Sequence, residues 1–188
     1  MHYLELIDLA KLFRALHSSR SLNREEHHMA ALSCFFTGAR ISQVLALRGT
    51  DLVRLNDAPK LMIRGIKGGM DGLRDIHVDA EQSEFDMSPV ISMAARRGGN
   101  RLFGGLDRFY FNDVLKRAGA AAGLPDTFMH SHVFRHSAGM AIFDATQRIG
   151  AVTQFLLHRS PGSAYAYLQE NDGKRAQAAM NGLKLGVA

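Results

Sequence analysis

The chain has 188 residues, of which 46% are hydrophobic and 22% are charged, a composition that fits one globular domain. Its formal net charge is +5 and its pI is about 9.7. A basic balance favours an anionic partner such as nucleic acid, although many basic proteins bind none. The single cysteine, Cys34, excludes an internal disulfide. The first residues lack the pattern of a signal peptide, and no apolar run reaches the roughly 18 residues of a membrane span, so we expect a cytoplasmic protein.

The first half of the chain predicts helices followed by a small sheet. Leucines at helical spacing predict an amphipathic helix over residues 4–16. Asn23 and Glu26 have the spacing of a capping box and predict a second helix that runs to about Thr37. Gly38 allows a bend before a short helix over residues 42–48. Apolar runs separated by turn residues then predict a three-stranded antiparallel sheet over residues 51–55, 60–64 and 73–78.

The second half is predicted to be mainly helical. A helical stretch begins at Asp79, is disturbed near Ser88–Pro89 and ends before two glycines, and residues 101–104 form a brief extended piece. Further helices are predicted over residues 107–122, 131–146, 149–157, 160–168 and 174–183. We therefore expect an α+β fold, mainly α-helical with one small sheet, in a single domain over residues 1–188, of which 169–188 form a C-terminal tail with the last helix.

Two arginines occur in settings that suit phosphate binding. Arg40 lies in T-G-A-R-I-S-Q-V-L-A-L-R, and Arg135 lies in H-S-H-V-F-R-H-S. The guanidinium group grips phosphate oxygens in pairs better than any other side chain. A lone arginine at a helix junction, however, is more often simply solvated.

Histidines and a tyrosine accompany these arginines. His132 precedes Arg135 by three residues, so the two share one helix face. His158 follows F-L-L, where a buried structural histidine is the alternative reading. Tyr167 lies nine residues after His158, and tyrosine can act as a covalent nucleophile.

The same histidines raise the alternative of a metal site. His130, His132 and His136 are close in sequence, and the last two are one helical turn apart. No cysteine pair and no H-E-x-x-H pattern accompanies them, and Arg135 among the ligands would repel a cation. We therefore expect no metal and no other cofactor.

In order and wording, these segments resemble the catalytic domain of the tyrosine recombinases, the phage integrase family, from about Leu4 to about Gln169. The resemblance implies that the arginines clamp the scissile phosphate, that the histidines handle protons, and that a hairpin lysine in G-I-K-G-G is the general acid. It favours the later of two tyrosines, Tyr165 and Tyr167, as the nucleophile. The implied catalytic residues are Arg40, Lys67, His132, Arg135, His158 and Tyr167, with Arg64 and Arg74 beside the lysine as candidate DNA-phosphate contacts.

The chain departs from the family pattern at two positions. Gln43 stands where an acidic residue is common, so it offers hydrogen bonds but no charge to support Arg40. Leu157 stands where glycine usually precedes the histidine, which puts the aim of His158 in question. These departures keep a non-catalytic DNA-binding regulator open as an alternative, beside an activity like that of type IB topoisomerases and a metal-dependent hydrolase.

The resemblance implies a site-specific recombinase that cuts and rejoins double-stranded DNA through a 3′-phosphotyrosyl intermediate. It implies a homo-tetramer on paired DNA sites, and it requires neither ATP nor metal because fixed cationic side chains supply the charge. The chain starts almost directly at the catalytic domain, so we expect the usual N-terminal core-binding domain to be absent. In extent it is similar to the short invertases or to an excised catalytic domain.

Overall fold

The first helix packs against the core through the apolar face that the leucine spacing predicted. A computed structural model describes residues 3–66, 70–158 and 161–165, with side chains left out at 161 and 163. Helix α1 (Leu6–His17) buries Leu9, Leu12, Phe13 and Leu16, which confirms the predicted helix and its apolar face.

Helix α2 (Arg24–Thr37) is confirmed, but the capping box predicted at its start is wrong. Asn23 makes no side-chain cap hydrogen bond, and its amide instead donates to the carbonyl of Gly105 at 3.4 Å. The Glu26 carboxylate accepts from Arg97 at 2.6 Å and from the Gly105 N–H at 3.2 Å. A charged partner from another element outcompetes the local cap, so both residues fasten α2 to the 97–105 segment.

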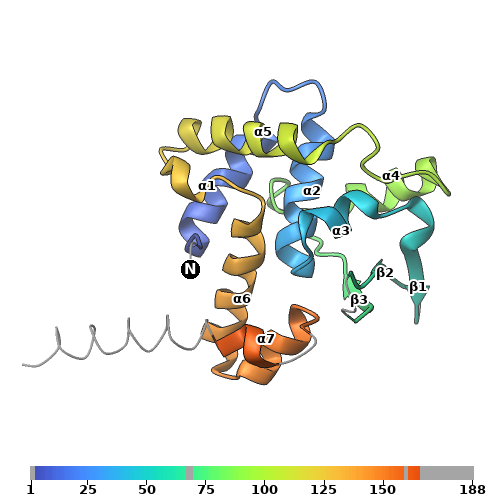
Figure 1. Cartoon of the computed structure of the whole chain (residues 1–188). Coiled ribbons are helices and arrows are strands. Elements are labelled where there is room, and N and C mark those ends of the chain that lie inside the picture. Colours follow the sequence, from blue (N-terminus) through green and yellow to red (C-terminus); the bar gives the residue numbers. More distant parts are fainter. Residues whose placement is uncertain (1–2, 67–69, 159–160, 166–188) are drawn as a thin grey trace, which may run out of the picture.

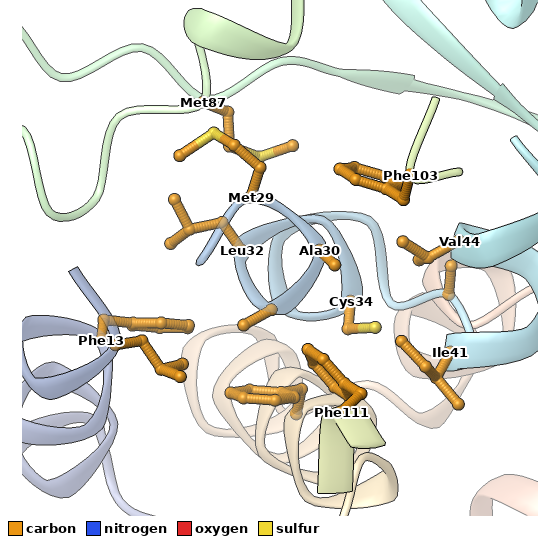
Figure 2. Packing of buried hydrophobic residues seen from close by; sticks show 14 of the residues in the cluster. Phe13, Met29, Ala30, Leu32, Cys34, Ile41, Val44, Met87, Phe103 and Phe111 are labelled. Atoms are coloured by element: carbon orange, nitrogen blue, oxygen red, sulfur yellow. The ribbon is translucent and has the colours of Figure 1, made fainter. Parts of the chain in front are cut away.

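Helix α2 is the centre of the main hydrophobic core. Its residues are buried on more than one face because α1, α3 (Ile41–Ala46) and α6 (His132–Thr146) all pack against it. Figure 2 shows Met29, Ala30, Leu32 and Cys34 of α2 among apolar side chains from other elements. Those labelled there are Phe13, Ile41, Val44, Met87, Phe103 and Phe111.

The three-stranded antiparallel sheet is confirmed, with small changes in its bounds. Strands β1 (Leu52–Leu55), β2 (Ala58–Ile63) and β3 (Gly72–Asp75) lie in the order β1-β2-β3. The β1–β2 loop is the pair Asn56–Asp57, in which both residues have positive φ, 51° and 62°. This is the backbone of a two-residue type I′ hairpin, whose twist matches that of the strands.

The helix expected from Asp79 begins ten residues later. Helix α4 (Pro89–Arg97) starts at Pro89, whose fixed φ and missing N–H suit the first helical position. Before it, the Asp79 carboxylate accepts from the N–H groups of Glu81 and Gln82, at 3.0 and 2.9 Å. These bonds close a turn in place of a helix. The extended piece expected at 101–104 reduces to one bridge, between Arg101 and Arg48.

The remaining helices match their predictions closely. Helix α5 (Arg108–Ala121) is capped by Asp107, whose carboxylate accepts from the N–H of Phe109 at 2.6 Å. Helix α6 carries Phe134, which stacks on Phe13 of α1 at 5.6 Å, and it leads to α7 (Ile149–Phe155). Figure 1 shows α6 running from below α5 down to α7, with the sheet below α3 and α4. Short 3₁₀ turns complete the described elements: η1 (Gly49–Asp51), η2 (Asp126–Phe128) and η3 (Pro161–Ala164).

Mainly helical structure with one small sheet confirms the expected fold class. The helix expected over 160–168 is described only at its start, as η3, and the tail 169–188 with its helix lies outside the described residues. Among the described helices, none has the length and hydropathy that crossing a membrane requires.

Candidate active site

A pocket of about 880 Å³ opens where the starts of several helices meet the end of β2 and the turn after α7. It brings together three of the predicted catalytic side chains, Arg40, His132 and His158, although they are far apart in sequence. Arg64 and Arg108 add two more cations to its lining, and Asp51 is the single acidic residue among the described lining residues. The pocket therefore has the charge to hold an anion.

Arg40 is delivered to this pocket by a bend that the sequence encodes locally. Helix α2 ends at Gly38, whose φ is +67°, and a Cβ at this position would lie 2.8 Å from the Phe155 ring. Both the backbone conformation and the close approach require glycine. The Thr37 hydroxyl accepts from the N–H of Ala39 at 3.2 Å, so the two residues before Arg40 are fixed.

Gln43 links the main chain of Arg40 to that of Arg64 through the two ends of its amide. Its Oε1 accepts from the Arg40 N–H at 3.0 Å, and its Nε2 donates to the Arg64 carbonyl at 2.7 Å. Gln43 is only 7% exposed, so these bonds are largely shielded from water. A carboxylate could form the first bond but not the second, because it has no donor. Glutamine in place of the common acidic residue thus adds a hydrogen bond to the Arg64 carbonyl that a carboxylate could not donate.

Arg135 lies beneath the pocket and holds main-chain groups. It is 5% exposed and does not line the pocket itself. Its Nη1 donates to the Gly38 carbonyl, and its Nη2 donates to the Leu156 carbonyl at 2.6 Å. It joins the bend before Arg40 to the turn before His158.

His158 is aimed by a left-handed turn after α7. Leu157 has φ of +52°, the conformation that glycine usually supplies. The N–H of His158 donates to the Thr153 carbonyl at 2.9 Å, and that of Leu157 donates to Gln154 at 3.2 Å. Burial, together with the charges of Arg135 and Arg40, lowers the pKa of His158 to about 4. Among the described residues, its buried Nδ1 has no hydrogen-bond partner.

His132 is the first residue of α6 and is also held neutral. Burial lowers its pKa, and the charge of Arg108 is the next cause. His130 and His136 flank it at ring-centroid distances of 6.4 and 6.3 Å. Within the described ranges, no group of three His, Cys, Asp or Glu side chains is placed to hold a metal ion.

The two arginines expected beside the hairpin lysine have different surroundings. Arg64 lines the pocket, and its guanidinium donates to Asp51 at 2.8 and 3.2 Å. Arg74 is not among the described lining residues and donates to main-chain carbonyls at the end of α7. Lys67 and Tyr167 both lie outside the described residues. Tyr165 is 54% exposed and is not among the described lining residues.

Arg108 is a cationic pocket residue to which no motif in the sequence pointed. It follows the helix cap Asp107 directly, so the first turn of α5 carries it to the pocket rim. The cap was readable, because aspartate before a helical pattern marks a start. Which helix starts converge is a tertiary property that the pattern does not contain.

Solved structures match the fold of this chain over nearly its whole length. A post-cleavage complex of the XerH site-specific recombinase with a palindromic difH substrate aligns with a TM-score of 0.74 at 21% identity, covering 94% of this chain and 52% of that one. The catalytic domain of bacteriophage HP1 integrase aligns with a TM-score of 0.63 at 21% identity, covering 90% of this chain and 88% of that one. The chain has the fold of a tyrosine recombinase catalytic domain.

Sequence comparison agrees with the tyrosine recombinase fold. The tyrosine recombinase XerC of Bifidobacterium longum subsp. infantis is 25% identical over 162 residues, which cover 80% of this chain and 45% of XerC. The chain thus spans about half the length of XerC and of XerH. No protein-family model matches it.

Proposed function

We propose that this chain is a site-specific DNA recombinase that cuts and rejoins strands through a 3′-phosphotyrosyl intermediate. The observation that carries the proposal is the convergence of Arg40, His132 and His158 on one cationic pocket within this fold. A phosphodiester is anionic, and charge grows on its non-bridging oxygens as it is attacked. Fixed cations around the pocket are suited to stabilise that charge.

The proposed step assigns each residue one task. The Tyr167 hydroxyl oxygen attacks phosphorus and forms the phosphotyrosyl bond as the bond to the 5′ oxygen breaks. Lys67 gives its proton to the departing 5′ oxygen. Arg40 faces the phosphate, and Arg135 adds positive charge from beneath and keeps both turns in place.

His132 and His158 complete the set as proton-handling groups. Both are neutral near pH 7 because their pKa values are lowered. A neutral imidazole can accept the tyrosine proton or donate to a phosphate oxygen. Attack by a 5′ hydroxyl from a second duplex reverses the step and reseals the strand, so no ATP is consumed.

Double-stranded DNA is the proposed partner, and a homo-tetramer on two sites is the proposed working unit. The XerH structure is a complex with its difH substrate, which supports the choice of duplex DNA. Arg64 and Arg108 on the pocket rim are proposed to contact phosphates next to the scissile one.

Covalent trapping tests the proposal without knowledge of the target sequence. The chain is incubated with a library of duplexes that carry one nick and randomised arms, and the protein-linked DNA is isolated and sequenced. We expect adducts that disappear in Tyr167→Phe and persist in the matched control Tyr165→Phe. Adducts that persist in Tyr167→Phe would show a different nucleophile. Sequence-selective binding without any adduct would favour the regulator.

Chelation is a second arm of the same experiment. Because arginines supply the positive charge in the proposed step, adduct yield should be unchanged in excess EDTA. A loss that zinc or magnesium restores would overturn this mechanism.

A further inference from the structure

The carbonyl groups at the end of α7 accept hydrogen bonds from two arginines, Arg74 and Arg135, that lie far away in the sequence. Nη2 of Arg74 donates to the carbonyls of Phe155 at 2.6 Å and Gln154 at 3.1 Å. Arg135 takes the next carbonyl, that of Leu156, at 2.6 Å. The last carbonyls of a helix have no partners within it, so the two guanidinium groups supply hydrogen bonds that these carbonyls would otherwise lack. The same carbonyls form the negative end of the helix dipole, so the positive charges are also favourable there.

Arg74 extends the same link to the bend before Arg40. Its Nε donates to the carbonyl of Thr37 at 3.3 Å, and its Nη1 donates to Leu73 at 2.9 Å. The guanidinium carbon also lies 5.4 Å from the centroid of the Phe155 ring. Four of the five N–H donors of the guanidinium therefore serve main-chain carbonyls. An arginine used in this way is poorly placed to grip a DNA phosphate.

A second contact joins the same two segments. Gly72 and Arg74 are two residues apart in β3, so they lie on one face of the strand. A Cβ at Gly72 would come within 2.7 Å of Cδ2 of Leu157, so the leucine packs directly on the strand backbone. In Figure 1, β3 and the end of α7 lie in the same lower part of the molecule. The face of β3 thus holds the turn through a guanidinium and through an apolar side chain.

We propose that Arg74 is a positioning residue, which acts with Arg135 to fix the turn bearing His158 against the bend bearing Arg40. Its effect on cleavage rests on the proposed function, whereas the fixing of the turn does not. The turn needs such support because Leu157 occupies a left-handed conformation that the Cβ of any non-glycine residue disfavours. Arg74 lies in β3 and donates to carbonyls at the ends of both α2 and α7.

The ring of His158 is a direct reporter of this role. Burial and its charged and titratable neighbours Arg135, Arg40 and His136 lower its pKa to about 4. In an NMR titration of the wild type, we expect the imidazole signals of His158 to stay constant between about pH 7.5 and about pH 5. The His158→Gln variant identifies which signals belong to His158. Arg74→Met keeps the apolar stem but removes the donors, so the turn loosens, water reaches the ring, and His158 begins to titrate within this window.

An internal control separates positioning from general loosening. His28 is 3% exposed, and burial lowers its pKa to about 4 as well, but its ring bonds to the Glu84 carbonyl, away from α7. In Arg74→Met, the pKa of His158 should rise and the pKa of His28 should stay the same. Arg54→Met, on the outer strand β1, is the matched arginine control and should move neither. Arg74→Lys keeps the charge with a single donor head, should give a smaller shift, and carries the test if the Met variant does not fold.

DNA binding decides between the positioning role and a phosphate contact. With a random-sequence duplex as the probe, Arg74→Met should leave the salt dependence of affinity unchanged, whereas losing a phosphate contact lowers the slope by about one. Three results would each overturn the proposal: a lower slope of DNA affinity against salt in Arg74→Met, an unchanged pKa of His158, or a rise in the pKa of both His158 and His28. If no adduct is ever trapped but His158 alone moves, the recombinase function fails and the positioning role stands.

Discussion

The start of α3 and the turn after α7 each bring one predicted catalytic residue, Arg40 or His158, to the pocket, but the two segments are held by different means. The first is fixed by the neutral amide of Gln43, which bonds two main-chain groups without backbone strain. The second is fixed by two guanidinium groups and by Leu157 in a left-handed conformation. Both regions depart from the family pattern, and each departure has its own local support. A changed residue at an active site therefore has to be judged by the contacts it makes.

The largest effects should come from Arg40, which begins α3, and from Arg135, which bonds the turn after α7. Arg40→Ala should slow adduct formation by roughly 10²–10³-fold while changing the unfolding free energy by less than about 0.5 kcal/mol. Arg135→Ala should slow cleavage too, and should also lower the unfolding free energy by about 3 kcal/mol, because two buried carbonyls lose their donors. Trapping kinetics and urea unfolding measure both quantities. Equal losses of stability in the two variants would contradict the comparison.

The amide of Gln43 should give a graded series. Gln43→Met leaves the Arg40 N–H and the Arg64 carbonyl without partners and should lower the unfolding free energy by about 2–3 kcal/mol. Gln43→Glu keeps only the first bond and should fall between Met and the wild type. Urea denaturation at one pH gives the order. A glutamate variant as stable as the wild type would show that the bond to Arg64 contributes nothing.

Leu157 should separate strain from packing. Leu157→Ala keeps a left-handed non-glycine residue and loses the contact with Gly72, so it should lower the unfolding free energy by about 1–2 kcal/mol. Leu157→Gly loses the same contact but removes the strain, and should be about 1 kcal/mol more stable than the alanine variant. Thermal and urea unfolding of both variants test this. If alanine is the more stable of the two, the turn is not strained.

The smallest effect is a pH signature of the α7 turn. The folded pKa of His158 lies below its unfolded value of 6.5, so its contribution to stability is present above pH 6.5 and is lost as pH falls toward about 4. Because the ring is partly open to solvent, we expect a contribution of only about 1 kcal/mol. His158→Asn should flatten the acid side of the stability curve by this amount. Gln43→Met should lower the curve equally at every pH, since an amide does not titrate.

The sequence predicted the elements well where the signal is local. Leucine spacing in α1 and the turn residues around the sheet each act within a few residues, and the structure agrees with them. The capping box failed because of a distant partner: the Glu26 carboxylate accepts from Arg97 and makes no cap. The helix expected from Asp79 failed for a local reason, because the Asp79 carboxylate accepts from the N–H groups of Glu81 and Gln82 and closes a turn.

The candidate site divides along the same line. The motifs around Arg40, His132 and His158 named three residues that the structure gathers in one pocket. Their spacing could not reveal that Arg108 joins them, because convergence of helix starts depends on packing between α3, α5 and α6. Nor could it reveal that Arg74 bonds the carbonyls of α7, which lie about eighty residues further along the chain.

These long connections have a consequence for folding. The bonds that Arg135 makes to Gly38 and Arg74 makes to Phe155 close loops of 97 and 81 residues. Contacts of such separation form late, because chain entropy opposes them until nearer contacts exist. We therefore expect α1, α2 and the hairpin to form before the pocket does. On a ribosome, a nascent chain could not hold the Arg40 bend in its final place until α7 and the turn after it had emerged.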